Sequence, residues 1–210
     1  LVMGQGLGFL PAGMVDQHFD ARHRLGRLAR ALFELPATER FGFGIDEDTA
    51  LVVDLGSGRA GVAGASAITL LDARAARRLP GKRFGAEGLR LAVANPGDTI
   101  DLATLAVGPA PGTAAPIDDP DERQPRVHQQ SGGMAVPEPA VGTLLAESLF
   151  GPNPLSTLER PSVRADAGVI YRFTRLPGAA CWQSGGSRSV SGIGFALHPV
   201  TVSFAAAGLQ

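Results

Sequence analysis

Residues 15–28 of the chain are VDQHFDARHRLGRL, and residues 42–53 are GFGIDEDTALVV. The first stretch joins an apolar run to a helical pattern and carries His18 at the junction, where loops expose reactive groups. The second opens an apolar strand with three consecutive acidic residues, 46–48. A histidine and a separately anchored carboxylate can activate a nucleophile, because the carboxylate fixes the imidazole tautomer and stabilises the imidazolium. Spacing alone supports this only weakly, since an isolated histidine near a helix start is more often structural.

The residues around His18 predict a strand followed by a helix. Residues 7–19 are expected to form a short strand that runs into a loop. From Ala21 to Leu35, leucines recur at steps of three and four residues, which predicts an amphipathic helix. Asp20 is the expected N-cap of this helix, and Pro36 is expected to end it.

Three β-rich runs are predicted after the helix. The segments 40–55 and 59–72 are rich in apolar and β-branched residues, and the GSGR turn from Gly56 to Arg59 separates them. A third strand is expected from Gly88 to Ala94, followed by an NPGD turn whose Asp98 is interpreted as a turn residue.

The second half of the chain changes in composition. Residues 108–142 are dense in Pro, Gly and charge, which is typical of a linker or a long surface loop. Residues 143–210 contain a short helical stretch and β-like runs. The predicted organisation is the C-terminal part of an α/β domain over 1–107, a linker over 108–142 and a small β-rich tail module over 143–210.

Composition limits the classes of function. Apolar residues make up 44% of the 210 residues and charged residues 19%, which suits a globular protein with a real core. The net charge of −1 gives no overall positive field for nucleic acid or an anionic membrane, so neither partner is expected. Cys181 is the single cysteine, which excludes an internal disulfide. His23, His128 and His198 lack ligand-like spacing, so neither a metal nor another cofactor is expected.

Two segments taken together carry a family resemblance. GLGFLPAGMVDQHFDARHRLGRL at 6–28, followed by GIDEDTALVV at 44–53, resembles the cyanophycinase branch of the dipeptidase-E-like serine peptidases. The resemblance covers roughly residues 5–72. It implies an α/β fold that is part of a three-layer sandwich like that of the class I glutamine amidotransferases. It also makes His18 the general base and Glu47 its orienting carboxylate, with Asp46 in reserve.

The same resemblance assigns substrate-binding residues. Without it, the arginines after His18 would be interpreted as a solvated basic face. Cyanophycin is a polyaspartate with arginine joined to each side chain, and guanidinium is a natural bidentate partner for its free carboxylates. The partners implied are therefore cyanophycin or an acidic peptide, and a second copy of the chain in a homodimer. The expected substrate-binding residues are Asp16, Gln17, Arg22, Arg24 and Arg27.

The sequence departs from the family pattern at the nucleophile. The family's serine lies on an upstream glycine-flanked elbow, and no such segment precedes His18 in this sequence. Ser66, Ser131 and Ser184 lie in a strand, a Pro-rich stretch and a Gly/Ser turn, and none is expected to be a nucleophile. The opening run LVMGQGLGFLPAGMV lacks the marks of a signal peptide and is expected to be chain interior.

The prediction is accordingly a C-terminal portion of a serine-type hydrolase that degrades cyanophycin to β-Asp-Arg dipeptides. By itself this portion is expected to be inactive. Two alternatives stay open: a non-catalytic homologue that binds an acidic peptide, and an aspartyl or isoaspartyl dipeptidase.

Overall fold

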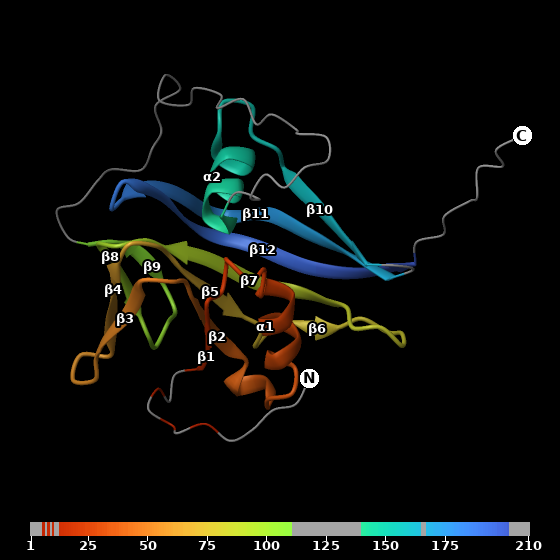
Figure 1. Ribbon diagram of the computed structural model, residues 1–210, viewed down its shortest axis with the longest axis horizontal. Coiled ribbons are helices and arrows are strands. Elements are labelled where there is room, and N and C mark those ends of the chain that lie inside the picture. Colours follow the sequence, from red (N-terminus) through yellow and green to blue (C-terminus); the bar gives the residue numbers. More distant parts are fainter. Residues whose placement is uncertain are drawn as a thin grey trace, which may run out of the picture.

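The computed structural model describes residues 6, 8, 10, 13–110, 140–164 and 167–201. Its fold is α/β, with a mixed sheet and few helices (Figure 1). The described helices are α1 (Leu25–Leu32), the short 3-10 helix η1 (Ala37–Glu39) and α2 (Val141–Phe150).

An eight-stranded sheet forms the centre of the molecule. Its order is β1-β2-β5-β7-β12-β11-β10, and β6 pairs beside β7. β1 and β2 are parallel, whereas the other described pairs of this sheet are antiparallel. The strands are β1 (Met14–Gln17), β2 (Phe41–Ile45), β5 (Ile68–Asp72), β6 (Arg77–Arg78), β7 (Ala86–Ala94), β10 (Thr157–Arg164), β11 (Ala167–Ser184) and β12 (Ser187–Thr201).

A second, four-stranded sheet packs on the large one. Its antiparallel order is β3-β4-β8-β9. One hydrophobic cluster joins the small sheet to β2 and β5, and another joins α1 and α2 to the opposite face of the large sheet. The result is a helix layer, a large sheet and a small sheet (Figure 1). The strands are β3 (Thr49–Asp54), β4 (Arg59–Gly64), β8 (Asp98–Asp101) and β9 (Val107–Pro109).

The FGFG sequence of β2 explains how that strand serves both layers. Successive side chains of a strand point to opposite faces. Phe41 and Phe43 enter the cluster shared with the small sheet. On the helix side a Cβ at Gly42 would lie 2.8 Å from Leu28, and one at Gly44 would lie 2.3 Å from the ring of Phe19. Glycine therefore lets α1 and the loop before it approach the strand closely.

The first helix is shorter than the sequence predicts, and Asp20 is not its N-cap. Residues 20–23 form turns, and His23 has a φ of +49°, which lies outside the helical region. The helix begins at Leu25 with Arg24 as N-cap, and it ends at Leu32, before Pro36. The leucine spacing still marks the buried face, because Leu25, Leu28 and Leu32 are all in the core.

The β-rich segment after residue 143 continues the large sheet. β12 pairs with β7, with Val190 opposite Val93 and Phe195 opposite Leu89. Side chains from α1, α2 and both halves of the sheet share one hydrophobic cluster. Within the described residues, the expected tail module is thus continuous with the first part of the chain. Most of the predicted linker lies outside the described residues, which resume at Ala140.

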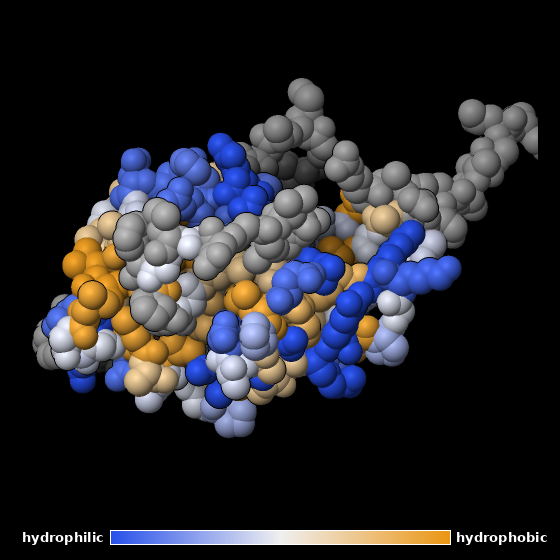
Figure 2. Space-filling model, turned by 90° about the horizontal axis from the view of Figure 1, so that it is seen from below, coloured by the Kyte–Doolittle hydropathy of each residue, from blue (hydrophilic) through white to orange (hydrophobic). Residues whose placement is uncertain are grey.

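The surface is uneven in polarity. Seen from below, apolar surface gathers toward the left, where the small sheet lies in Figure 1, and long hydrophilic side chains project toward the right (Figure 2). Val52 of β3 is 57% exposed and Leu55, just after it, is 77% exposed. No helix among the described residues is long and apolar enough to cross a membrane.

Candidate active site

The site lies where the parallel strands β1 and β2 end. Their register pairs Met14 with Gly42 and Gln17 with Ile45, so the residues that follow the two strands come out side by side. The carboxyl ends of parallel strands are where α/β proteins place reactive groups. His18 follows β1, and Asp46 and Glu47 follow β2.

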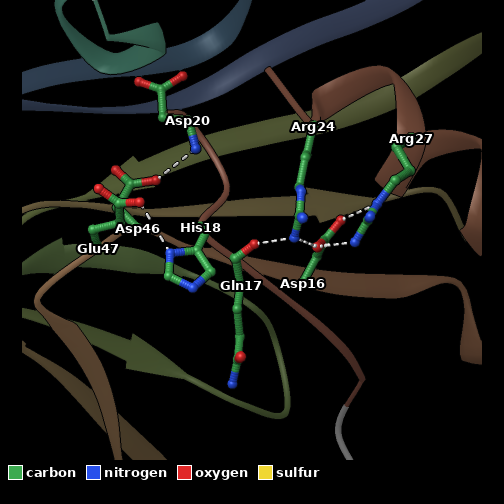
Figure 3. A network of polar contacts seen from close by, with 8 residues as sticks. All are labelled: Asp16, Gln17, His18, Asp20, Arg24, Arg27, Asp46 and Glu47. Atoms are coloured by element: carbon green, nitrogen blue, oxygen red, sulfur yellow. Dashed lines mark hydrogen bonds and ion pairs between the residues drawn. The ribbon is translucent and has the colours of Figure 1, made fainter. Parts of the chain in front are cut away.

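His18 and Glu47 form a hydrogen-bonded pair. Nδ1 of His18 lies 3.0 Å from Oε1 of Glu47, as the sequence predicts, and about half of each side chain is exposed (Figure 3). A carboxylate only accepts hydrogen bonds, so in the neutral imidazole the proton lies on Nδ1, facing Glu47, and Nε2 carries the lone pair. No hydrogen bond from Nε2 to the described residues is present. The pair has the geometry of a general base with its orienting carboxylate, while the catalytic roles stay a prediction.

The two turns that hold this pair have unusual backbone conformations. His18 has a φ of +48° and Asp48 a φ of +52°, both in the left-handed region. This region is sparsely populated by residues other than glycine, although Asp and His are enriched there. Phe19 fixes the first turn, because its amide donates to the carbonyl of Ile45 over 3.2 Å and its side chain is fully buried.

Asp46 is hydrogen-bonded to the surrounding turns instead of to His18. Its Oδ1 accepts from the amide of Asp20 over 3.0 Å (Figure 3). Its Oδ2 accepts from the Ser66 hydroxyl over 3.1 Å. Burial raises the pKa of Asp46, although these hydrogen bonds act to lower it. Both carboxylate oxygens are thus already engaged, which makes Glu47 rather than Asp46 the partner of the imidazole.

Asp20 connects the His18 loop to the second helix. Its Oδ2 accepts from the amide of Val141, the first residue of α2, over 3.0 Å. Burial raises the pKa of Asp20, against the lowering effect of the Val141 amide. Asp20 therefore satisfies a free amide at the start of α2, although the sequence predicts that it caps α1.

Asp16 binds two of the predicted substrate-binding arginines. It is 6% exposed and accepts from Nη1 of Arg24 and Nε of Arg27, each over 3.0 Å (Figure 3). A second contact joins Arg27 to Asp16, and Arg24 also donates to the carbonyl of Gln17. These contacts give Arg24 and Arg27 a structural role that the sequence does not predict. Their part in substrate binding stays a prediction.

The other candidate groups are dispersed. Arg22 is exposed and makes no ion pair with the described residues. The Ser66 hydroxyl donates to Asp46, and the Ser184 hydroxyl donates to the carbonyl of Pro96 over 3.0 Å. Ser131 and His128 lie outside the described residues. Among the described residues, no group of three His, Cys, Asp or Glu side chains could hold a metal ion.

Sequence reasoning did not find the residues that support the pair. Thr49 donates to the carbonyl of Glu47 over 2.9 Å and accepts from the Ser66 amide over 3.0 Å, so Ser66 steadies the Glu47 turn on two sides. Ser66 lies between β4 and β5, and no sequence feature near it indicates that it contacts Asp46 and Thr49. The contact between Asp20 and Val141 spans 121 residues and has no local signal either.

Curated relatives agree with the motifs. The chain is 37% identical over 114 residues to the cyanophycinase of Trichormus variabilis, a match of 51% of this chain and 37% of that protein. The same figures hold for the cyanophycinase of a Nostoc species. This chain is cyanophycinase-like. The cyanophycinase of Synechococcus elongatus is 42% identical over 72 residues, which is 34% of this chain and 21% of that protein.

The match to these cyanophycinases is partial on both sides. The chain spans 37% of the length of the Trichormus and Nostoc relatives. No protein-family model matches the chain.

Proposed function

We propose that His18 and Glu47 are the general base and the orienting carboxylate of a serine-type hydrolase that degrades cyanophycin to β-Asp-Arg dipeptides. The observation that carries the proposal is the 3.0 Å contact between His18 Nδ1 and Glu47 Oε1, beyond the ends of two parallel strands. The contact leaves Nε2 as the lone-pair nitrogen that can take a proton from a hydroxyl nucleophile. The likeness to cyanophycinases supports the substrate.

The nucleophile is proposed to come from a further strand. Within the described residues β1 pairs only with β2, so its other edge is open. A parallel strand on that edge would end beside His18, on the side away from Glu47. Carboxylate, imidazole and hydroxyl would then follow one another along the edge of the sheet. With that strand, the fold would become a three-layer sandwich like that of the class I glutamine amidotransferases.

Substrate binding is proposed to involve the polar residues beside His18. Arg22 is exposed and is the arginine best able to pair with a carboxylate of an acidic polymer. Gln17 is also exposed at the end of β1. Arg24, Arg27 and Asp16 would contribute by holding this end of β1 in place. A homodimer is proposed from the resemblance alone.

The test uses His18→Ala and Glu47→Gln in a protein that contains these residues together with the proposed nucleophile strand, with release of β-Asp-Arg from cyanophycin as the readout. We expect His18→Ala to reduce kcat by about 10⁶-fold. Glu47→Gln should reduce it by about 10⁴-fold, because the wrong tautomer is then stabilised. Asp48→Asn is the matched control. It changes the adjacent carboxylate, and Asn also tolerates the left-handed backbone found at Asp48.

Two results would contradict the proposal. Full activity of either site variant would remove that residue from the chemistry. Turnover by residues 1–210 alone, lost on Ser66→Ala or Ser184→Ala, would mean that the nucleophile lies within this chain. Activity on aspartyl or isoaspartyl dipeptides but not on cyanophycin would keep the mechanism and change the substrate. Binding of the polymer without hydrolysis would favour the non-catalytic homologue.

A further inference from the structure

Two hydrogen bonds that involve side chains join the residues after β1 to the residues after β2. His18 contacts Glu47 through its side chain, and Asp20 contacts Asp46 through its backbone amide (Figure 3). Residues 18 and 20 belong to one turn, and residues 46 and 47 belong to the other. The second hydrogen bond therefore sets the separation of the two turns that carry the first.

The backbone at His18 needs support from both sides. With a φ of +48°, this residue lies in a conformation that persists only where the surrounding structure determines it. On one side Gln17 is paired with Ile45 in the sheet. On the other, the amide of Phe19 bonds to Ile45 and the amide of Asp20 bonds to Asp46.

Asp46 is itself fixed from the opposite direction. Its amide donates to the carbonyl of Ala67 over 3.2 Å, and its second carboxylate oxygen accepts from Ser66. Ala67 and Ser66 precede β5, which pairs with β2 across the sheet. Asp46 thus ties the His18 turn to the body of the sheet, while leaving Glu47 as the side chain that faces the imidazole.

We infer that Asp46 is a positioning residue for the His18–Glu47 pair, acting through the backbone amide of Asp20. The inference rests on the proposed function for its link to activity, but the geometry that it concerns is measurable without turnover. Among the described residues, Asp46 makes no hydrogen bond with the His18 side chain. Its effect is therefore on where the imidazole lies and which nitrogen carries the proton.

The experiment combines kinetics with the nitrogen NMR signals of His18, assigned by comparison with His18→Ala, in the same protein that contains the proposed nucleophile strand. Asp46→Ala removes the acceptor for the Asp20 amide. We expect it to lower kcat by about 100-fold with little change in KM, because a displacement of about 1 Å in a catalytic group has that effect. The Nδ1–H tautomer of His18 should lose its predominance.

Asp46→Asn supplies the rescue. Its amide oxygen can still accept from Asp20, and the Ser66 hydroxyl can rotate to accept from the new amide group. We expect kcat within about threefold of the parent and an unchanged tautomer. Asp54→Ala is the matched control, because the Asp54 carboxylate also accepts from backbone amides and from a serine hydroxyl, at the far end of β3.

Several outcomes overturn the inference. One is an unchanged His18 tautomer in Asp46→Ala, whether or not activity falls. Another is that Asp46→Asn loses both the activity and the predominance of the Nδ1–H tautomer of His18. If Asp46→Ala does not fold, Asp46→Ser tests the same truncation with a polar group left for Ser66. If His18→Ala itself stays active, the proposed function fails, and the NMR comparison still decides whether Asp46 positions the imidazole.

Discussion

Asp98, at the start of β8, accepts a hydrogen bond from the indole nitrogen of Trp182, 84 residues later, over 2.7 Å. The carboxylate is 1% exposed and also accepts from the Ser189 hydroxyl and from the amide of Asn95. A buried carboxylate with this many donors holds the turn after β7 against the β11–β12 hairpin. The sequence predicts only a turn residue at this position.

Asp98→Asn should destabilise the protein by about 2–3 kcal/mol, because an amide group replaces one acceptor oxygen among buried donors. Denaturant unfolding followed by the fluorescence of Trp182, the single tryptophan, measures the change. Asp101→Asn is the control on the same strand. Its carboxylate is exposed, so water can replace its contacts and the loss should be smaller. Equal losses would contradict a special role for Asp98.

Arg24→Ala should lower stability, whereas Arg22→Ala should not. Asp16 is 6% exposed, and removing Arg24 leaves part of its buried charge without a partner, which should cost about 2 kcal/mol. Arg22 is exposed and contributes no ion pair in the described structure. Thermal unfolding of the two variants, beside cyanophycin kinetics, separates a folding role from a substrate role. Equal melting temperatures of the two variants would indicate that Arg24 contributes no more to stability than an exposed surface arginine.

Asp72 should give a defined pH dependence of stability. Burial would raise the pKa of Asp72, but hydrogen bonds from Arg74 and the charges of Arg74 and Arg90 outweigh burial and lower it. A carboxyl whose pKa is lowered by folding stabilises the protein above its unfolded pKa and loses this contribution as the pH falls. Asp72→Asn should therefore cost about 1 kcal/mol at pH 7, discounted for the solvent around Arg74.

The difference in unfolding free energy between Asp72→Asn and the parent should disappear as the pH falls below 3.8, the ordinary pKa of an aspartate side chain. Denaturant unfolding at a series of pH values measures it, and Glu39→Gln on the exposed turn before β2 is the control. A gap that stays constant through the acidic range would show that the loss comes from packing rather than from charge.

Val52→Lys should reduce self-association without lowering stability. β3 lies at the end of the small sheet, and Val52 is 57% exposed on its outer side, in a strand without lysine or proline. Exposed apolar edge strands pair with other chains, and a lysine opposes this. Light scattering should fall, with unfolding free energy within about 0.5 kcal/mol of the parent. Val53→Lys, on the inner side, should instead destabilise the core.

The local elements were largely predictable from the sequence. Alternating apolar residues and the GSGR turn predicted the strands on either side of Gly56, and leucine spacing marked the buried face of α1. The pairing of His18 with Glu47 was predictable through the family resemblance that their two short motifs carry together, because spacing along the chain supports it only weakly. Such patterns depend on neighbours within about a turn of helix or a few strand positions.

Only the tertiary structure decided which distant groups meet. The start of α1 moved because residues 20–24 follow the turn at His18 instead of their helix propensity. Asp20 found its donor at Val141, Asp98 found one at Trp182, and β12 joined the sheet beside β7. A buried polar group takes whichever partner the packed core brings to it, because leaving it unpaired is costly. That partner is set by the whole fold, so no short stretch of sequence contains it.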